Sequence, residues 1–521
     1  MKWRRLSSPV ILLLLCAASL GGFLWISRQG YGTGLPLDDA WIHQTYARNL
    51  AERGEWSFLP GEPSAGSTAP LWSGLLALAR LTGLGPIAST FVLGVLTLAL
   101  TSLLCERWLR ARVADVEVTT LWVAALVALE WHLVWAGLSG METLALALLT
   151  VAVLFASERG KLPPLALGAM IGLGVWLRPD ALLLALPAAI VIGVDGQRGT
   201  GERLRRLLWV AVGLCLLFVP YLAFNRSLSG EWWPSTFYAK QAEYASLRAD
   251  PLWTRLLLQV RAPLAGAGAV LALGLVVSAA HALRSGRFER LAPLIWGAVF
   301  LGAYALRLPV TYQHGRYAMP VLPVLLVVGS EGLVRWCQPG AAGIGRRLAS
   351  RVWLVCLPAI TLIFWFVGGR AYGRDVAIIE TEMVAAASWV RDNTPSGALI
   401  AAHDIGALGY FGERRLIDLA GLVSPEVIPI LRDEAALAAY LDARDADYLV
   451  TFPGWYPELT RGRTPLYLTG GPHGPAAGGE NMAIYLWRRG SFAPQDMAVL
   501  YSGKPRHDRD DHGDHRRHYR R

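Results

Sequence analysis

Two adjacent carboxylates, Asp38 and Asp39, follow directly after the first long apolar segment of this 521-residue chain. A carboxylate held near hydrocarbon is costly unless water, a partner or a substrate offsets its charge. One explanation is structural, because either aspartate can cap the helix that the next residues predict. The other is chemical, because a carboxylate in contact with water can act as a general base. The spacing of the two residues does not decide between these explanations.

Other polar side chains stand near the ends of later apolar segments. The topology described below brings all of them to the same face of the membrane as the aspartates: Glu142, Arg178, Asp180, Lys240, His314, Arg316, His403 and Asp404. A convergent set of carboxylates and cations at a membrane surface suits an anionic substrate that is attached to a lipid.

Each of these residues also has a structural explanation. Glu142 stands where it can cap the helix that begins beside it. The sequence Arg178-Pro179-Asp180 is typical of a turn, and its arginine can extend towards the membrane surface. Lys240 follows the aromatic stretch 232–238, so it is an interfacial anchor or a phosphate contact.

The residues nearer the C-terminus also have both a structural and a functional explanation. His314 and Arg316 lie in one short loop, as surface residues or as substrate contacts. His403 and Asp404 precede Ile405-Gly406, a pattern that favours a turn at a strand end over the rim of a substrate site.

The composition gives the class of protein that must position these residues. The chain is 54% hydrophobic and 17% charged, and its mean hydropathy is +0.38. These values predict an integral membrane protein with a lipid bilayer as its surroundings. The net charge of +10 does not indicate a nucleic-acid partner, because the basic residues separate the apolar runs instead of forming one surface.

Apolar segments separated by basic loops predict about eleven membrane spans. Arginine-rich loops alternate with loops that carry Asp, Glu, Trp and Tyr, which places the N-terminus in the cytoplasm. The first span is also compatible with a signal peptide. The predicted spans are 9–26, 86–108, 118–138, 143–157, 164–177, 181–194, 207–224, 259–283, 291–308, 319–334 and 352–367.

The stretch 37–53, in the first outer loop (27–85), predicts an amphipathic helix that lies on the membrane surface. From residue 368 onward the composition changes to that of a soluble domain. Two helices (376–393 and 434–442) and four short strands (398–402, 415–419, 448–451 and 483–487) are predicted there.

The predicted fold class is therefore mainly α, a polytopic transmembrane helical bundle with a small C-terminal α/β domain outside the cytoplasm. The predicted domains are a membrane domain over 1–370, the α/β domain over 371–498, and a disordered tail rich in His and Arg over 499–521.

The first loop resembles the signature of the GT-C superfamily of glycosyltransferases. The resemblance rests on Asp38-Asp39-Ala40-Trp41-Ile42-His43, residues 46–50 and residues 60–63. Arg178-Pro179-Asp180, residues 234–240 and residues 404–411 are similar to later blocks of a bacterial branch that includes the terminal arabinofuranosyltransferases of mycobacterial-type cell walls. Ser235 stands where the branch usually has Asn. The likeness runs through most of the chain, and the first loop is its specific part.

This resemblance implies roles for the residues above. Asp38 or Asp39 would act as the base that takes a proton from the acceptor hydroxyl. Cations would bind the departing phosphate of the donor, namely Lys240, Arg178 and Arg316. The expected substrate-binding residues are His43, Glu142, Asp180, Tyr238, His314, His403 and Asp404. A single displacement predicts inversion at the anomeric carbon, and a divalent metal, Mg²⁺ or Mn²⁺, is compatible with the acidic pair.

The expected function is transfer of a sugar from a polyprenyl-phosphate carrier to an envelope glycan, lipid or protein, on the outer face of a bacterial plasma membrane. Two other classes compete with it. Glu130 and His132 lie inside one span, as a flippase or transporter for lipid-linked glycans requires. A scaffold without catalytic activity would need neither aspartate.

Overall fold

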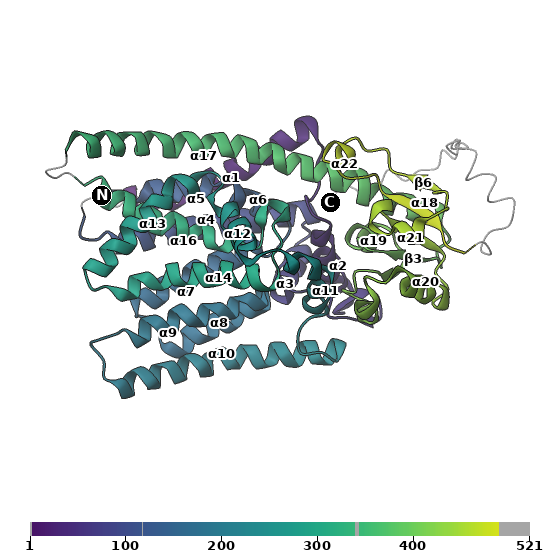
Figure 1. Ribbon diagram of the computed structural model, residues 1–521, viewed down its shortest axis with the longest axis horizontal. Coiled ribbons are helices and arrows are strands. Elements are labelled where there is room, and N and C mark those ends of the chain that lie inside the picture. The colour runs from purple at the N-terminus through teal and green to yellow at the C-terminus, as the bar shows by residue number, and fades with distance from the viewer. Residues whose placement is uncertain (1–2, 117, 339–342, 489–521) are drawn as a thin grey trace.

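The computed structural model describes residues 3–116, 118–338 and 343–488 of the chain. It consists of a long helical bundle with a small α/β domain at one end (Figure 1). We call this end of the bundle the domain end and the opposite end the far end. The predicted fold class is confirmed by this architecture. The predicted tail, 499–521, lies outside the described residues.

The apolar segments form helices because a helix pairs its own backbone groups, which lipid cannot do. In the described residues, six helices are long and apolar enough to cross a membrane, and the bent pair α5–α6 makes a seventh. The prediction of eleven spans is therefore neither confirmed nor excluded. The bundle contains α1 (Trp3–Gly30), α4 (Pro86–Arg112), α5 (Leu121–Leu129), α6 (Trp131–Leu138), α7 (Thr143–Arg159), α8 (Pro164–Leu177), η1 (Pro179–Leu184), α9 (Ala185–Gly193), α10 (Thr200–Ser229), α13 (Ala267–Arg284), η3 (Phe288–Leu291), α14 (Ala292–Arg307), η4 (Met319–Val321), α16 (Leu322–Trp336) and α17 (Ile344–Ile379).

Two predicted spans are not single straight helices. The segment 259–283 divides into α12 (Leu252–Leu264) and α13, because Gly266 between them has φ 101°, a conformation that ends a helix. The segment 118–138 bends by 57° at Glu130. Glu130 accepts a hydrogen bond from the backbone N–H of Leu133 (3.0 Å) and so caps α6.

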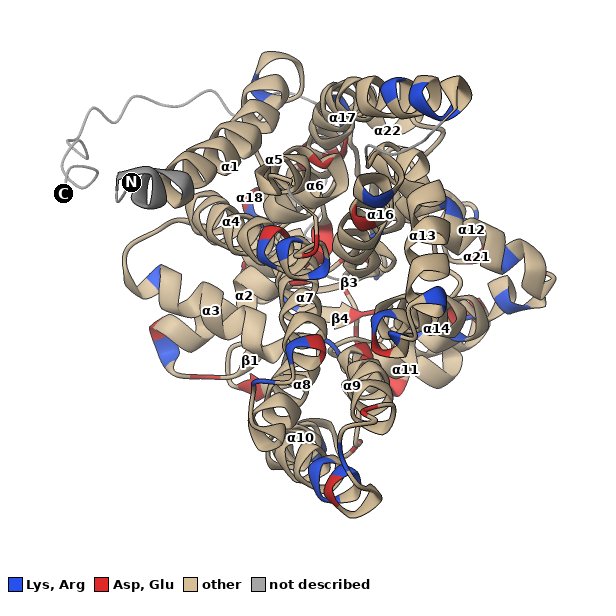
Figure 2. Ribbon diagram, turned by 90° about the vertical axis from the view of Figure 1, so that its left-hand side faces the viewer, with Lys and Arg blue, Asp and Glu red and all other residues tan. Residues whose placement is uncertain are grey.

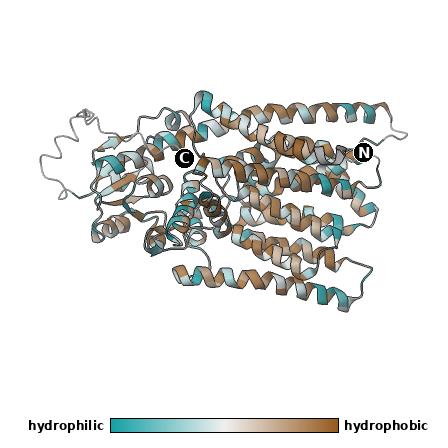
Figure 3. Cartoon of the chain, turned by 180° about the vertical axis from the view of Figure 1, so that it is seen from behind, coloured by the Kyte–Doolittle hydropathy of each residue, from teal (hydrophilic) through white to brown (hydrophobic). Residues whose placement is uncertain are grey.

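The surface of the bundle is suited to lipid. Apolar residues cover its helices, whereas hydrophilic residues gather in the α/β domain and at the helix ends (Figure 3). On α10, Leu204, Leu208, Leu216 and Val219 are all exposed. Such a continuous exposed apolar face is rare in a soluble monomer and normal in a membrane span.

Charged residues collect at the far end of the bundle (Figure 2). Glu331 of α16 is fully buried there and accepts hydrogen bonds from Arg112 (2.6 Å), Ser278 (2.7 Å) and Arg290 (2.8 Å). Arg112 also pairs with Glu158 of α7. Because each of these buried charges has a partner, the network joins five elements, α4, α7, α13, η3 and α16, without leaving an uncompensated charge.

The C-terminal domain is built on a five-stranded sheet of order β4-β3-β5-β7-β6. Strands β4, β3 and β5 are parallel, and β7 and β6 add antiparallel pairs. The elements of this domain are α18 (Ala385–Asn393), β3 (Leu399–Ala402), α19 (Gly406–Phe411), β4 (Arg415–Asp418), η6 (Pro425–Ile430), α20 (Glu434–Ala443), β5 (Tyr448–Thr451), η7 (Pro453–Trp455), α21 (Pro457–Thr460), β6 (Tyr467–Leu468), α22 (His473–Ala476) and β7 (Ala483–Leu486).

The four predicted strands and the helix 434–442 correspond to β3, β4, β5, β7 and α20. The predicted helix over 376–393 is confirmed, including its end before Thr394, but it does not begin at Val376. Helix α17 continues through a π-helical turn, η5 (Glu380–Val384), into α18, so the last helix of the bundle leads directly into the domain. Glu382 of this turn is buried and accepts a hydrogen bond from the backbone N–H of Met482 (2.9 Å), which fixes the sheet on the helix.

A layer of short elements lies between the bundle and the C-terminal domain (Figure 1). It comprises α2 (Asp38–Arg53), β1 (Ser57–Leu59), β2 (Glu62–Pro63), α3 (Pro70–Leu81), α11 (Ser235–Glu243), η2 (Ala245–Ala249) and α15 (Tyr312–Gly315). Helix α2 begins one residue after the start of the predicted stretch, 37–53, and ends with it. Other parts of the protein cover this helix, because α3 and α19 pack against it and most of its residues are buried.

Candidate active site

Asp38 begins α2 and is 8% exposed. Its two carboxylate oxygens accept hydrogen bonds from the backbone N–H groups of Gly406 (2.7 Å) and Ala407 (2.8 Å) at the start of α19. Burial and the nearby Asp404 carboxylate raise the pKa of Asp38 to about 8, although both N–H donors oppose that shift. Asp38 therefore connects α2 to the C-terminal domain, and both of its oxygens are already engaged.

Asp39 has a different environment. Arg316 donates a hydrogen bond to its Oδ2 (2.6 Å), and Lys240 Nζ lies 3.7 Å from the same oxygen. Its side chain is 30% exposed. Burial alone would raise the pKa of Asp39, but the charges of Lys240 and Arg316 hold it well below its ordinary value. Asp39 is the ionised and accessible member of the pair.

Neither aspartate caps α2. Leu37 is the residue at the N-cap position, and no side chain accepts a hydrogen bond from the first turn of that helix. The capping explanation therefore fails for the helix that follows the pair, while Asp38 binds the first turn of a different helix, α19.

The two cations come from separate elements. Lys240 is part of α11, and Arg316 directly follows α15. Both donate to the hydroxyl oxygen of Tyr317, at 3.0 Å and 3.1 Å respectively. Arg316 is 3% exposed, and its Nη1 has no hydrogen-bond partner in the described structure. A buried guanidinium nitrogen without a partner indicates a place for an anion.

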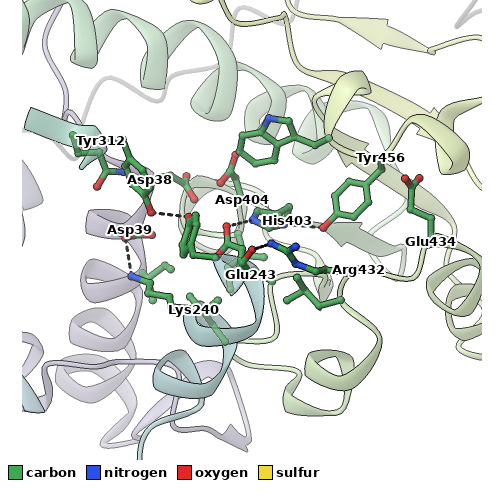
Figure 4. Close-up of a pocket in the computed structure, with 18 residues that line it drawn as sticks. Asp38, Asp39, Lys240, Glu243, Tyr312, His403, Asp404, Arg432, Glu434 and Tyr456 are labelled. Atoms are coloured by element: carbon green, nitrogen blue, oxygen red, sulfur yellow. Dashed lines mark hydrogen bonds and ion pairs between the residues drawn. The ribbon is translucent and has the colours of Figure 1, made fainter. Parts of the chain in front are cut away.

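Asp39 and Lys240 line a cavity of about 790 Å³ between α2, α11 and the C-terminal domain, which we call the interdomain cavity (Figure 4). Its volume is near the upper end for a ligand site. Its other lining residues are Asp38, Ile42, Glu243, Tyr244, Tyr312, Gln313, His403, Asp404, Ile405, Ala420, Leu422, Leu431, Arg432, Glu434, Trp455 and Tyr456.

A second cavity, of about 720 Å³, lies at the domain end of the bundle, and we call it the bundle cavity. Lys240 lines both cavities, and Arg316 lines the bundle cavity while it contacts Asp39. The remaining lining is largely apolar and aromatic: Thr68, Met141, Glu142, Arg178, Pro179, Asp180, Leu182, Leu183, Trp233, Thr236, Phe237, Gln241, Ala303, Tyr304, Arg307, Leu308 and Tyr317.

Arg178 has partners on three sides in the wall of the bundle cavity. It donates to Asp180 (2.5 Å) and to the hydroxyl oxygen of Tyr304, and its Nε lies 3.8 Å from Glu142. Oε2 of Glu142 is buried and has no hydrogen-bond partner in the described structure. Arg178 is therefore compensated by carboxylates, whereas Arg316 keeps a buried donor, Nη1, without a hydrogen-bond partner in the described residues.

His403 and Asp404 follow β3 and line the interdomain cavity, so the strand-end and substrate-rim interpretations both describe them. His403 Nδ1 is 2.8 Å from the Tyr456 hydroxyl, and Nε2 is 3.6 Å from Glu243. Burial lowers the pKa of His403, but Glu243 and Asp404 outweigh it and the pKa is raised. Burial raises the pKa of Asp404 to about 6, although His403 opposes the shift.

Three predicted substrate-binding residues line neither cavity. His43 is buried in α2, where Nδ1 is 2.8 Å from Ser73 Oγ and Nε2 is 3.7 Å from Glu142. His314 pairs with Asp375 (2.7 Å). Tyr238 packs its ring edge-on against Phe237. His43 and Tyr238 each contact a residue that lines the bundle cavity, Glu142 and Phe237 respectively, whereas the partner of His314, Asp375, lines neither cavity.

Several lining residues were not predicted from the sequence. Glu243 follows Lys240 by one helical turn, and Tyr317 is next to Arg316, so spacing was a usable signal for both. No local signal indicated Tyr304, Arg432 or Trp455, because each reaches a cavity through packing between distant segments.

The donor set does not fit a divalent metal at the aspartates. Both oxygens of Asp38 accept backbone hydrogen bonds, and Asp39 faces two cations that would repel Mg²⁺ or Mn²⁺. Within residues 3–116, 118–338 and 343–488, no three His, Cys, Asp or Glu side chains converge as a metal site requires.

Comparison with known proteins supports the fold. The crystal structure of ArnT from Cupriavidus metallidurans bound to undecaprenyl phosphate is similar with a TM-score of 0.57 and 16% identity, over 92% of this chain and 99% of ArnT. Its apo structure gives a TM-score of 0.53 and 14% identity, over 92% and 98% of the two chains. These likenesses show that the chain shares the fold of ArnT.

Other comparisons are weaker or partial. A cryo-EM structure of the arabinofuranosyltransferase AftD from Mycobacteria aligns at 18% identity over 91% of this chain and 41% of that one, with a TM-score of 0.45 that is too low to establish a shared fold. A family model described as a domain of unknown function, DUF8728, matches residues 375–493. A search of curated proteins finds no match.

Proposed function

We propose that this protein is an integral membrane glycosyltransferase that takes a sugar from a polyprenyl-phosphate carrier. The observation that carries the proposal is the position of Asp39, which faces the interdomain cavity and pairs with Arg316 and Lys240 at the wall of the bundle cavity. Asp39, the proposed base for the acceptor, thus contacts Lys240 and Arg316, the proposed cations for the leaving group, between the two cavities.

The bundle cavity suits the donor. Its apolar and aromatic lining fits a polyprenyl chain that enters from the bilayer, and Lys240 and Arg316 fit the phosphate. The unpartnered Nη1 of Arg316 supports an anion at this point. The structure of ArnT with undecaprenyl phosphate shows that a protein of this fold binds such a lipid.

The proposed reaction is a single displacement. The Asp39 carboxylate accepts the proton of an acceptor hydroxyl, whose oxygen forms a bond to the anomeric carbon of the donor sugar. The bond between that carbon and the phosphate oxygen breaks, and polyprenyl phosphate leaves with the electron pair. Lys240 and Arg316 stabilise the charge that develops on it, and the anomeric configuration is inverted.

The two cations also link donor binding to the strength of the base. In the free protein they lower the pKa of Asp39, which makes the carboxylate a weak base. A donor phosphate would share their positive charge, so the pKa of Asp39 would rise when the donor is bound. The base would thus be strongest in the complex that holds the sugar.

The proposed location is the plasma membrane of a bacterium, with the N-terminus in the cytoplasm and the C-terminal domain outside it. The arginine-rich loops support this orientation by the positive-inside rule. The acceptor would then be an envelope glycan, lipid or protein, and the donor sugar a pentose or a hexose.

The flippase alternative has less support. It draws on Glu130 and His132, but these residues pair with each other (2.8 Å), and Glu130 caps α6. The charged residues that face the two cavities gather at the domain end instead of following a path through the bundle.

The test uses purified protein in lipid nanodiscs, a panel of polyprenyl-phosphate sugars as donors and an envelope extract as acceptor. Asp39→Asn should lower transfer by about 10²- to 10⁴-fold, the usual contribution of a general base. Glu52→Gln, on the exposed part of the same helix, is the control. Full activity of a folded Asp39→Asn variant would contradict the mechanism. No transfer by the parent protein from any donor in the panel would favour the scaffold.

A further inference from the structure

The interdomain cavity carries an excess of negative charge. Its carboxylates are Asp39, Glu243, Asp404 and Glu434, together with Asp38, whose raised pKa of about 8 keeps it largely protonated at neutral pH. Its cations are Lys240, Arg432 and, when protonated, His403. The two permanent cations are already engaged. Lys240 contacts Asp39 and Tyr317, while Arg432 donates to the backbone oxygen of Glu243 and to Ser246. An anionic occupant would therefore meet uncompensated carboxylates and be repelled.

The ionised carboxylates that keep a free oxygen need hydrogen-bond donors from an occupant. An ionised carboxylate only accepts hydrogen bonds, so a ligand rich in hydroxyl groups is its natural partner. Oδ2 of Asp404 is buried and has no hydrogen-bond partner in the described structure. Asp404 follows β3 in the C-terminal domain and lines the same cavity as Asp39 (Figure 4), so this free acceptor and the proposed base face one cavity.

Aromatic rings complete the lining. Trp455 is 51% exposed, and its ring is held edge-on to His403 with centroids 5.0 Å apart. Across the cavity, the hydroxyl of Tyr312 donates to that of Tyr244 (2.6 Å). A fixed and exposed aromatic face binds the apolar C–H face of a sugar ring, while the hydroxyls around the ring remain free for the carboxylates.

We infer that the acceptor is an uncharged, polyhydroxylated glycan chain and that the C-terminal domain is the module that recognises it. This inference rests on the proposed function and narrows its acceptor to one class. The domain supplies His403, Asp404, Trp455 and Tyr456 to the cavity, and α2 supplies Asp39 at the point where a hydroxyl would react. Residues 375–493, which match a domain of unknown function, would then bind the acceptor.

The first arm of the test compares acceptors with the full-length protein in nanodiscs. The probes are neutral oligosaccharides of pentoses and hexoses, carboxylated oligosaccharides of matched length such as oligogalacturonides, a phosphorylated glycolipid and a basic protein. Transfer to neutral chains should exceed transfer to the anionic ones at least tenfold at low salt, and the difference should narrow as salt screens the carboxylates.

The second arm tests the aromatic contact. Trp455→Ala should raise the KM for a neutral oligosaccharide about tenfold, which corresponds to about 1.4 kcal/mol of lost binding. Trp389→Ala is the matched control, because Trp389 belongs to the same domain, stacks on Tyr467 and lines neither cavity. Saturation-transfer NMR on the parent without donor measures glycan binding separately from catalysis.

The outcomes separate this inference from the proposed function. Transfer that prefers the anionic oligosaccharides, the phosphorylated glycolipid or the basic protein would overturn the inference and leave the transferase intact. An unchanged KM in Trp455→Ala would do the same. Neutral-glycan binding that depends on Trp455, in a protein without transfer from any donor, would support glycan recognition and contradict the transferase.

Discussion

Asp38 of α2 and Gly406 of α19 lie in such close contact that the glycine has no room for a side chain. A Cβ at Gly406 would be 2.0 Å from the backbone oxygen of Asp38 and 2.8 Å from its Oδ2. The same glycine donates its N–H to that carboxylate (2.7 Å). This contact joins the first loop to the C-terminal domain and closes one wall of the interdomain cavity, beside Asp39.

Gly406→Ala should therefore separate α2 from α19. Backbone atoms cannot move aside as a flexible side chain can, so the substitution should lower the free energy of unfolding by about 1–3 kcal/mol, as overpacking does. It should also lower transfer activity. Thermal unfolding in nanodiscs measures the first effect. Gly397→Ala is the control, because a Cβ there meets nothing within 4 Å. Equal unfolding temperatures for the two variants would contradict this role of the contact.

Arg316→Lys should weaken donor binding although it keeps the charge. Lysine provides one point charge, whereas Arg316 contacts Asp39 and Tyr317 through Nη2 and retains Nη1 for the phosphate. We expect transfer to fall about 10²-fold, and undecaprenyl phosphate to stabilise the variant less than the parent in thermal unfolding. Arg391→Lys, an exposed arginine of α18, should leave both measurements unchanged. Equal stabilisation of Arg316→Lys and parent by the lipid would place the phosphate elsewhere.

The stability of the protein should fall as the pH rises from about 4 to about 8. The pKa of Asp404 is raised to about 6 and that of Asp38 to about 8, in both cases first by burial. The folded state thus binds more protons than the unfolded state in this window, and stability present below pH 4 is lost as each group ionises. Asp404→Asn removes one titrating group, so its unfolding temperature should vary less between pH 4 and pH 6. A parent that grows more stable over that interval would contradict this account.

Transfer should not require a divalent metal. The oxygens of Asp38 and Asp39 already pair with N–H groups and cations, and Lys240 and Arg316 supply the positive charge that a metal would bring to the phosphate. We expect the rate in excess EDTA to equal the rate in buffer. Loss of activity with EDTA, restored by Mg²⁺ or Mn²⁺ and not by Ca²⁺, would contradict this expectation.

Much of the architecture follows from local sequence patterns. Apolar runs such as 86–108 and 207–224 became helices, and strand β5 has the predicted bounds, because hydrophobic period and length act within one segment. The break at Gly266 and the continuous helix from α17 into α18 were not predicted. The first depends on one backbone angle, and the second on the anchoring of Glu382 against the sheet.

The sequence by itself determined that this is a membrane protein of mainly helical fold and that an acidic pair begins α2, because composition and spacing are local properties. Only the tertiary structure decided which aspartate faces a cavity. Neighbouring residues of a helix point about 100° apart, so Asp38 meets α19 while Asp39 meets Lys240 and Arg316. Those partners are about 200 to 370 residues away along the chain, and folding alone brings them together.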